Sequence, residues 1–222
     1  MDVKFERKIK EFTEPLNNQY PRPWMTKLKN PCKADTFIVG KNQRNGYSVE
    51  AVGSHQRHLD ALFNRNGQGC RKLYDEITSG KASPTRKNCD NFVGILEGVG
   101  VRRILETNVI CYSTRMSADL WLKTHTGGGK RGEEIFRFLL ETIKPKVLIV
   151  HGIGASNNLA PILGVDLGNV PCSIDDLRLN DCGGMLVVVI PSLAPPEFSK
   201  KWSRWAPAHM TKVAKAVARH LE

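Results

Sequence analysis

The sequence of 222 residues lacks several features that would restrict its function at once. No apolar run approaches the roughly 20 residues needed to cross a bilayer, which argues against a membrane-spanning helix. The charged N-terminal stretch, residues 1–11, lacks the apolar core of a signal peptide, which predicts a soluble protein of the bacterial cytoplasm or the eukaryotic nucleus. The six cysteines include no Cys-x-x-Cys pair, so we expect free thiols and no metal site.

Acidic residues are in the minority. Lys and Arg number 33 against 22 Asp and Glu, for a net charge of +11. Such an excess favours a polyanionic partner such as DNA, although a merely basic surface explains the composition equally well. The hydrophobic fraction of 41% is sufficient for a buried core, so one compact domain is the expectation.

Short apolar runs alternate along the chain with segments of helical spacing. Strands are predicted at 34–39, 103–111, 147–150 and 185–190, and helices at 54–63, 71–77, 88–96, 132–143 and 208–221. This alternation predicts an α/β fold of three layers, α/β/α, with a central, mostly parallel four-stranded sheet. Residues 34–222 form the predicted domain, and the charged, Pro-rich residues 1–33 form an N-terminal arm anchored by Trp24.

Two glycine-rich stretches resemble nucleotide-binding loops only in part. Residues 126–132 lack the spacing of a P-loop, and we expect a flexible basic loop that touches DNA. Residues 152–154 lack the third glycine of a dinucleotide fingerprint, and we expect a tight turn from strand to helix.

Polar residues lie within or directly after three of the predicted strands. These are Gly40-Lys41-Asn42, Thr107-Asn108 and Pro191-Ser192. The carboxyl ends of parallel strands meet at one edge of a sheet, which is where α/β proteins bind their ligands. The sequence therefore predicts a functional site at this edge.

The same motifs, in this order, resemble the uracil-DNA glycosylase superfamily. The resemblance rests on four short motifs between residues 34 and 205: Phe37-Ile38-Val39-Gly40-x-Asn42, Leu105-Glu106-Thr107-Asn108, Lys144-Pro145-Lys146-Val147, and Pro191-Ser192. The Gly-x-Asn form of the first motif is similar to the single-strand-selective and mismatch-specific branch. The resemblance implies a monomeric DNA glycosylase without cofactor. Such an enzyme excises a damaged or modified pyrimidine (uracil-like or hypermodified cytosine) from single- or double-stranded DNA and leaves an abasic site.

The resemblance also implies roles for residues around the base. Asn42 would orient the attacking water, and Asn108 would read the edge of the flipped base with its amide donor and acceptor. Tyr47 would stack on the base, beside Gly40 and Lys41. Each residue has a structural alternative: a turn Asn, a strand Asn bonded to backbone, and a core Tyr.

Other residues would hold the DNA strand. Pro191 and Ser192 match a loop that grips phosphates, and Leu193 or Ala194 lies where relatives insert a wedge into the duplex. Further phosphate contacts are expected from basic residues, each of which has the alternative of being an ordinary solvated charge: Lys41, Arg44, Lys200, Lys201 and Arg204.

One position departs from the family pattern. Many relatives place a His directly before Pro-Ser, where it donates to the departing base, but this chain has Ile190. His151 is the candidate replacement, with a purely structural His as the alternative. The departure puts plain uracil in doubt as substrate and leaves two other hypotheses open. One is a non-catalytic DNA-binding module, and the other is a hydrolase of free nucleosides, which the positive charge disfavours.

Overall fold

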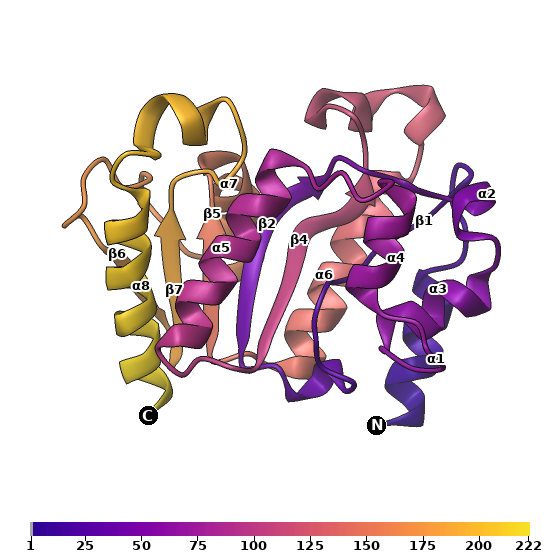
Figure 1. The fold of residues 1–222 in the computed structure, drawn as a ribbon, viewed down its shortest axis with the longest axis horizontal. Helices are drawn as coiled ribbons and strands as arrows, with labels where there is room; N and C mark the ends of the chain where they lie inside the picture. Colours follow the sequence, from indigo (N-terminus) through magenta and orange to yellow (C-terminus); the bar gives the residue numbers. More distant parts are fainter. Residues whose placement is uncertain (1) are drawn as a thin grey trace.

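The computed structural model describes residues 2–222, and a five-stranded sheet runs through the centre of the molecule (Figure 1). The strands lie in the order β4 (Ile104–Ser113), β2 (Thr36–Gln43), β5 (Val147–His151), β7 (Met185–Ile190) and β6 (Arg178–Cys182). Strands β4, β2, β5 and β7 are parallel, and β6 is antiparallel to β7. The prediction of an α/β fold with a mostly parallel sheet is confirmed, but the predicted number of four strands is wrong.

Strand β6 is the one that sequence patterning missed. Its side chains are exposed or partly exposed and mostly polar, so it has no apolar run that marks it as a strand. An edge strand of this kind is expected to be polar, because only one of its sides is paired. The turn between β6 and β7 is the pair Gly183-Gly184. A Gly-Gly pair before an apolar strand is a hairpin signal, and it is the feature that identifies this strand in the sequence.

Helices cover both faces of the sheet. In Figure 1, α5 (Pro84–Gly98) and α8 (Ala206–Leu221) lie in front of it, and α6 (Gly128–Ile143) and α7 (Ile153–Leu163) lie behind it. Since side chains alternate along a strand, each face has its own core. Ile38 packs among the buried residues of the α5/α8 face, whereas Phe37 packs in the larger core on the opposite face.

The predicted arm, residues 1–33, packs against the rest of the chain. It contains α1 (Val3–Phe12), whose Phe5 and Ile9 are buried, and Trp24 is only 1% exposed. The backbone of Met25 pairs with that of Glu106 on β4. The remaining short elements are β1 (Gln19–Tyr20), β3 (Tyr47–Ser48), α2 (Val49–Val52), α3 (His55–Leu62), α4 (Cys70–Ile77), 3₁₀ turns at Pro31–Lys33, Ser117–Trp121 and Lys123–His125, and a π-helical turn at Phe198–Trp202. None of the helices in residues 2–222 has the length and apolar character needed to span a membrane.

The glycine-rich stretch 126–132 is largely helical, which corrects the prediction of a flexible loop. Residues 128–132 form the first turns of α6, which packs closely on β4. A Cβ atom at Gly128 would lie 2.4 Å from the ring of Tyr112, and one at Gly132 would lie 2.8 Å from the backbone nitrogen of Cys111. These glycines therefore allow the helix to approach the strand. The turn predicted at 152–154 is confirmed, since Gly152 directly precedes α7.

His58 makes the stability of the fold sensitive to acid. Its ring is fully buried, stacks on Tyr20, and donates from Nε2 to the carbonyl of Pro21 at 2.9 Å. Burial lowers the pKa of His58 from 6.5 to about 3, so between these values the unfolded chain binds a proton that the folded chain does not. Stability present at neutral pH is therefore lost as the pH falls below 6.5.

The expected loss attributable to His58 is about 2–3 kcal/mol in the free energy of unfolding between pH 7 and about pH 4.5. Urea unfolding at the two pH values measures it. The matched variant is His58→Gln, whose amide can also donate to Pro21 but does not titrate. In this variant, unfolding at acid pH should take up about one proton fewer, so its free energy of unfolding should depend less on pH. An unchanged pH dependence would contradict the assignment of the effect to His58.

Candidate active site

A cavity of about 550 Å³ lies at the carboxyl edge of the sheet, within the range of pockets that hold small ligands. Its floor comes from the ends of β2 and β5 and the middle of β4, and its walls come from the start of α5, residues 114–117 and residues 192–197. The ends of parallel strands meet here as expected. Both chain termini lie at the opposite end of the molecule (Figure 1).

Gly40, Asn108 and His151 converge on the floor of the cavity. Gly40 and Asn108 are register partners on β2 and β4, and His151 ends β5. A Cβ atom at position 40 would lie 2.5 Å from Asn108 Oδ1 and 2.9 Å from His151 Nε2, closer than any side chain tolerates. Glycine at position 40 therefore allows the two polar side chains to approach each other across β2.

The side chains of Asn108 and His151 have free hydrogen-bonding capacity. Within residues 2–222, the carboxamide of Asn108 has no hydrogen-bond partner, and the ring nitrogen Nδ1 of His151 is buried without one. Burial, with a smaller effect from the positive charge of Arg86, lowers the pKa of His151 to about 4. The imidazole is therefore neutral at physiological pH and offers one donor and one acceptor. It lies directly beside Ile190 in the sheet register.

Asn42 lies two residues after Gly40 and therefore on the same face of β2. Its strand extends to Gln43, so Asn42 is not in a turn after the strand as predicted. Its Nδ2 donates to Thr114 Oγ1 at 2.8 Å, and its Oδ1 accepts from Ser117 Oγ at 2.8 Å. Both carboxamide atoms are thus fixed, and the orientation of the amide at the cavity wall is defined.

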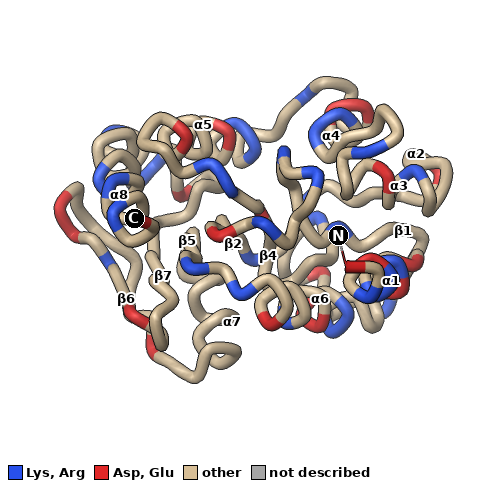
Figure 2. The backbone as a smooth tube through the Cα atoms, turned by 90° about the horizontal axis from the view of Figure 1, so that it is seen from below, with Lys and Arg blue, Asp and Glu red and all other residues tan. Residues whose placement is uncertain are grey.

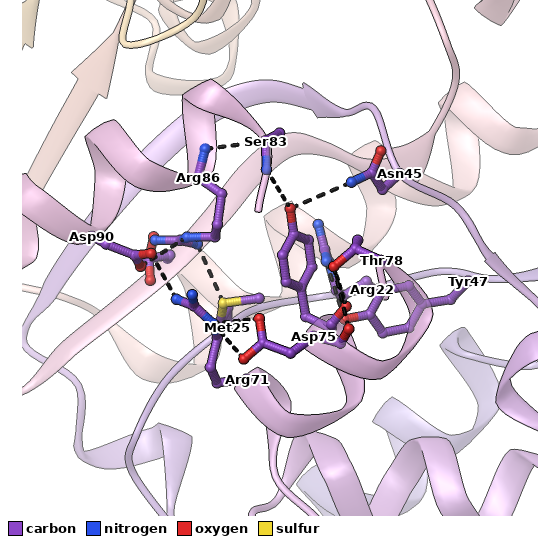
Figure 3. Close-up of polar contacts among 12 residues, drawn as sticks. Arg22, Met25, Asn45, Tyr47, Arg71, Asp75, Thr78, Ser83, Arg86 and Asp90 are labelled. Atoms are coloured by element: carbon purple, nitrogen blue, oxygen red, sulfur yellow. Dashed lines mark hydrogen bonds and ion pairs between the residues drawn. The ribbon is translucent and has the colours of Figure 1, made fainter. Parts of the chain in front are cut away.

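An ion-pair cluster forms the wall of the cavity below α5. Arg86, on the first turn of α5, pairs with Glu106 of β4, donates to Asp90 at 2.9 Å, and contacts the sulfur of Met25 (Figure 3). Burial alone would lower the pKa of Arg86, but the Glu106 carboxylate raises it, so the guanidinium stays charged. Burial raises the pKa of Glu106 against the opposing effect of Arg86. The pair ties the helix to the sheet.

Arg22 and Tyr74 complete the wall on the side of α4. The Arg22 guanidinium lies 4.8 Å from the ring centroid of Tyr47 and 5.6 Å from that of Tyr74, and it donates to the Tyr47 hydroxyl (Figure 3). Tyr47 itself is 2% exposed, belongs to the core and does not line the cavity. Tyr74 does line it. The aromatic residues that line the cavity are therefore Trp24 and Tyr74, and the structure does not bring Tyr47 to the position that stacking on a base requires.

The predicted strand-gripping residues are only partly brought together. Ser192 and Ala194 line the cavity, whereas Pro191 is buried behind it. Leu193 is fully buried in the core on the α5/α8 face, so it does not project from the surface as a wedge would. Three of the basic residues are exposed but lie outside the cavity lining: Lys200, Lys201 and Arg204.

Positive charge lies at the mouth of the cavity. Lys41, Arg44 and Arg115 line it. Within residues 2–222 these three form no ion pair, unlike Arg71 and Arg86, which both pair with Asp90. Figure 2, which views the opposite end of the molecule, shows Lys and Arg there as well, near β5 and α8. The net charge is thus spread over the surface, and it includes three cations at the mouth of the cavity, Lys41, Arg44 and Arg115.

Sequence reasoning gave no role to several residues of the cavity. Thr114 and Ser117 lie 72 and 75 residues after Asn42, with which they form hydrogen bonds. Nothing in the local sequence of these two residues or of Arg86 marks them. Glu106 is different. It lies two residues before Asn108 in the same strand, so the period of two places both side chains on one face, and a carboxylate on a buried face requires a partner.

Neither a scan against protein-family models nor a search of curated proteins returns a match to this chain. Within residues 2–222, no three His, Cys, Asp or Glu side chains are grouped so that they could hold a metal ion. The function is therefore inferred from the geometry of the cavity.

Proposed function

We propose that this protein is a DNA glycosylase that flips out a damaged or modified pyrimidine and hydrolyses its N-glycosidic bond, leaving an abasic site. The convergence of Asn108, His151 and Asn42 around Gly40, in a cavity large enough for a base, carries the proposal. The proposed reaction uses no metal or organic cofactor, and DNA is the proposed partner.

Asn108 and His151 would bind the base. The free carboxamide of Asn108 offers a donor and an acceptor together, which suits the edge of a pyrimidine. When the bond to the sugar breaks, its electron pair leaves with the base, and negative charge develops on a base oxygen. A neutral His151 donating from Nε2 would stabilise this charge in a water-poor site, in place of the side chain that Ile190 cannot supply.

Asn42 would position the water that attacks the sugar. A neutral amide is a weak base, but an oxocarbenium-like sugar requires only a water held at the correct place. Ser117 and Thr114 fix both ends of the amide, so the remaining lone pair of Oδ1 points in a defined direction. The water adds to C1′, its proton passes to solvent, and the departing base takes up a proton.

The cations at the mouth would hold the DNA backbone while the base is extruded. Unstacking a base costs a few kcal/mol, and contacts from Lys41, Arg44 and Arg115 to phosphates would offset this cost. Uracil, other deaminated or oxidised bases and hypermodified cytosines are all candidates as the excised base.

A panel of oligonucleotides tests the proposal. Each carries one of these bases and is incubated with the protein, followed by hot alkali, which breaks the strand at an abasic site. We expect a break at one or a few of the bases, and no release of the same base from the free nucleoside. A preference for the nucleoside would indicate a nucleoside hydrolase instead.

Gly40→Ala should reduce base excision by about 100-fold, because the added methyl group displaces Asn108 and His151, and displacements near 1 Å have effects of this size. Crowding should also destabilise the fold by about 1–3 kcal/mol. Single-turnover rates and urea unfolding measure the two effects. Gly94→Ala on α5 is the control, since its methyl group meets nothing within 4 Å. Equal excision rates for the two variants would argue against the proposed convergence.

A non-catalytic DNA-binding module is the second candidate. The fully buried Ile190 favours it, because relatives place a His there that donates to the departing base. DNA binding that survives Asn42→Ala, with no abasic product from any oligonucleotide of the panel, would support this candidate over the enzyme.

A further inference from the structure

Exposed apolar side chains gather beside the cavity. Within residues 2–222, seven large hydrophobic side chains are exposed. Three of them lie in one segment, residues 115–123: Met116 at 63%, Trp121 at 91% and Leu122 at 53%. A fourth, Ile153 at 39%, lines the cavity. Trp121 is an unusual side chain to leave in water, because burying an indole is strongly favourable.

The 115–123 segment is continuous with the cavity. It follows β4, and Arg115, Met116 and Ser117 line the cavity. Two short 3₁₀ turns shape it, and Asp119 fixes its start by accepting from the backbone nitrogen of Met116 at 2.8 Å. Figure 1 shows this segment as the pink chain that rises above β4, at the carboxyl edge of the sheet.

The positive charges around the 115–123 segment indicate which kind of partner binds its exposed apolar side chains. Arg115 and Lys123 begin and end the segment, and both are exposed. Lys41 and Arg44 lie on the same cavity. Aromatic side chains among cations are the combination that binds single-stranded nucleic acid, since bases stack on the rings and phosphates contact the cations.

We propose that the 115–123 segment binds the DNA strand next to the extruded nucleotide, with Trp121 stacking on a neighbouring base. This inference rests on the proposed function and adds a strand-contacting surface to it. It also supplies the exposed apolar side chain that the buried Leu193 does not. Because Ser117 of the same segment donates to Asn42, a strand bound here would also hold the residue that positions water.

Binding of a dye-labelled single-stranded DNA oligonucleotide, measured by fluorescence anisotropy at one fixed salt concentration, tests the inference. Trp121→Ala should weaken binding by about 5- to 100-fold, the range for loss of one base–aromatic stack, and Trp121→Phe should weaken it less. Leu179→Ala is the control, because Leu179 is an exposed apolar residue on β6, at the other edge of the sheet. It should leave binding unchanged.

Tryptophan fluorescence provides a second readout. Of the four tryptophans, Trp24 and Trp202 are each 1% exposed, Trp205 is half-buried, and Trp121 is 91% exposed. Quenching on addition of an unlabelled oligonucleotide should therefore come chiefly from Trp121 and be largely absent in Trp121→Ala. Equal affinity of Trp121→Ala and the parent protein would overturn the inference, as would quenching that follows protein concentration rather than DNA, which would indicate a second copy of the chain.

Base excision by the same variants separates this inference from the proposed function. If the parent protein excises a base and Trp121→Ala binds and excises equally well, the inference alone fails. If the parent protein binds DNA through Trp121 and excises nothing, the surface is supported and the enzymatic proposal fails. Absence of any DNA binding would overturn both.

Discussion

Replacing Arg86 by methionine is expected to destabilise the folded protein by about 3–5 kcal/mol. The side chains of Arg86 and Glu106 are 9% and 17% exposed, and each is the other's main charge partner. Methionine fills similar volume, but it leaves the Glu106 carboxylate in an environment that already raises its pKa. Removing one member of a buried pair costs far more than the pair contributes, because the remaining charge stays desolvated. Urea unfolding followed by circular dichroism measures the loss.

Two further variants test the cause of this destabilisation. Arg71→Met removes an arginine that pairs with Asp75 and Asp90 on the surface, where its side chain is 47% exposed. It should cost less than about 1 kcal/mol. The double variant Arg86→Met with Glu106→Leu removes both charges and should recover most of the lost stability. Similar losses for Arg71→Met and Arg86→Met would contradict the buried pair as the cause.

Asn42→Ala is expected to lower the rate of base excision by about 100-fold or more, because the attacking water loses the group that holds it. Oligonucleotide binding should change little, since the cations at the mouth and the 115–123 segment remain. The fold should lose about 1–2 kcal/mol with the two hydrogen bonds to Thr114 and Ser117. Single-turnover excision, run beside an anisotropy titration, measures rate and affinity separately.

Asn42→Asp is the matched variant. Ser117 can donate to a carboxylate as it does to the amide, and Thr114 can donate to it by giving up its hydrogen bond to the carbonyl of Met116. The side chain at position 42 should therefore keep its place. A carboxylate is also a stronger base than an amide, so excision should be retained or increased. Excision by Asn42→Ala at the rate of the parent protein would remove Asn42 from the mechanism.

The fold is largely predictable from the sequence because its central strands are apolar on both faces. Continuous apolar runs such as 147–150 and 185–190 are typical of parallel strands that are buried on both faces. Strand β6 escaped prediction because it is a polar edge strand, recognisable only by the Gly-Gly turn that follows it. The stretch 126–132 gave a different error, because it was predicted to be a flexible loop and is largely helical. Its glycines resemble a loop, but they serve the close packing of α6 on β4.

The site is predictable only where topology alone brings residues together. Asn42, His151 and Ser192 lie at or just beyond the carboxyl ends of their strands, and Asn108 lies within β4 as the register partner of Gly40. The order and register of the strands are therefore enough to place these residues at one cavity. Residues that reach the cavity from α5 or from the segment after β4 depend on tertiary packing, and local patterns do not mark them. Thr114, Ser117 and Arg86 belong to this group.

Tyr47 and Leu193 show that closeness to a motif in the sequence predicts site residues less well than the order of the strands does. Both follow a strand-end motif closely, and both were predicted to contact DNA. Tyr47 instead pairs in the short strand β3 and accepts from Arg22, and Leu193 turns inward to the core beneath α5 and α8. An apolar side chain directly after a strand is drawn into the nearest core, whichever motif precedes it.

Mass-spectrometric detection of a free base is the most direct test of the central claim. The protein is incubated with the oligonucleotide panel, and the solution is examined for released base and for the abasic strand, with Asn42→Ala in parallel. The account predicts release of one intact modified pyrimidine together with an unbroken abasic strand, at a rate at least about 100-fold lower in the variant. Intact oligonucleotides throughout, with binding preserved, would contradict hydrolysis of the N-glycosidic bond and leave a protein that only binds DNA.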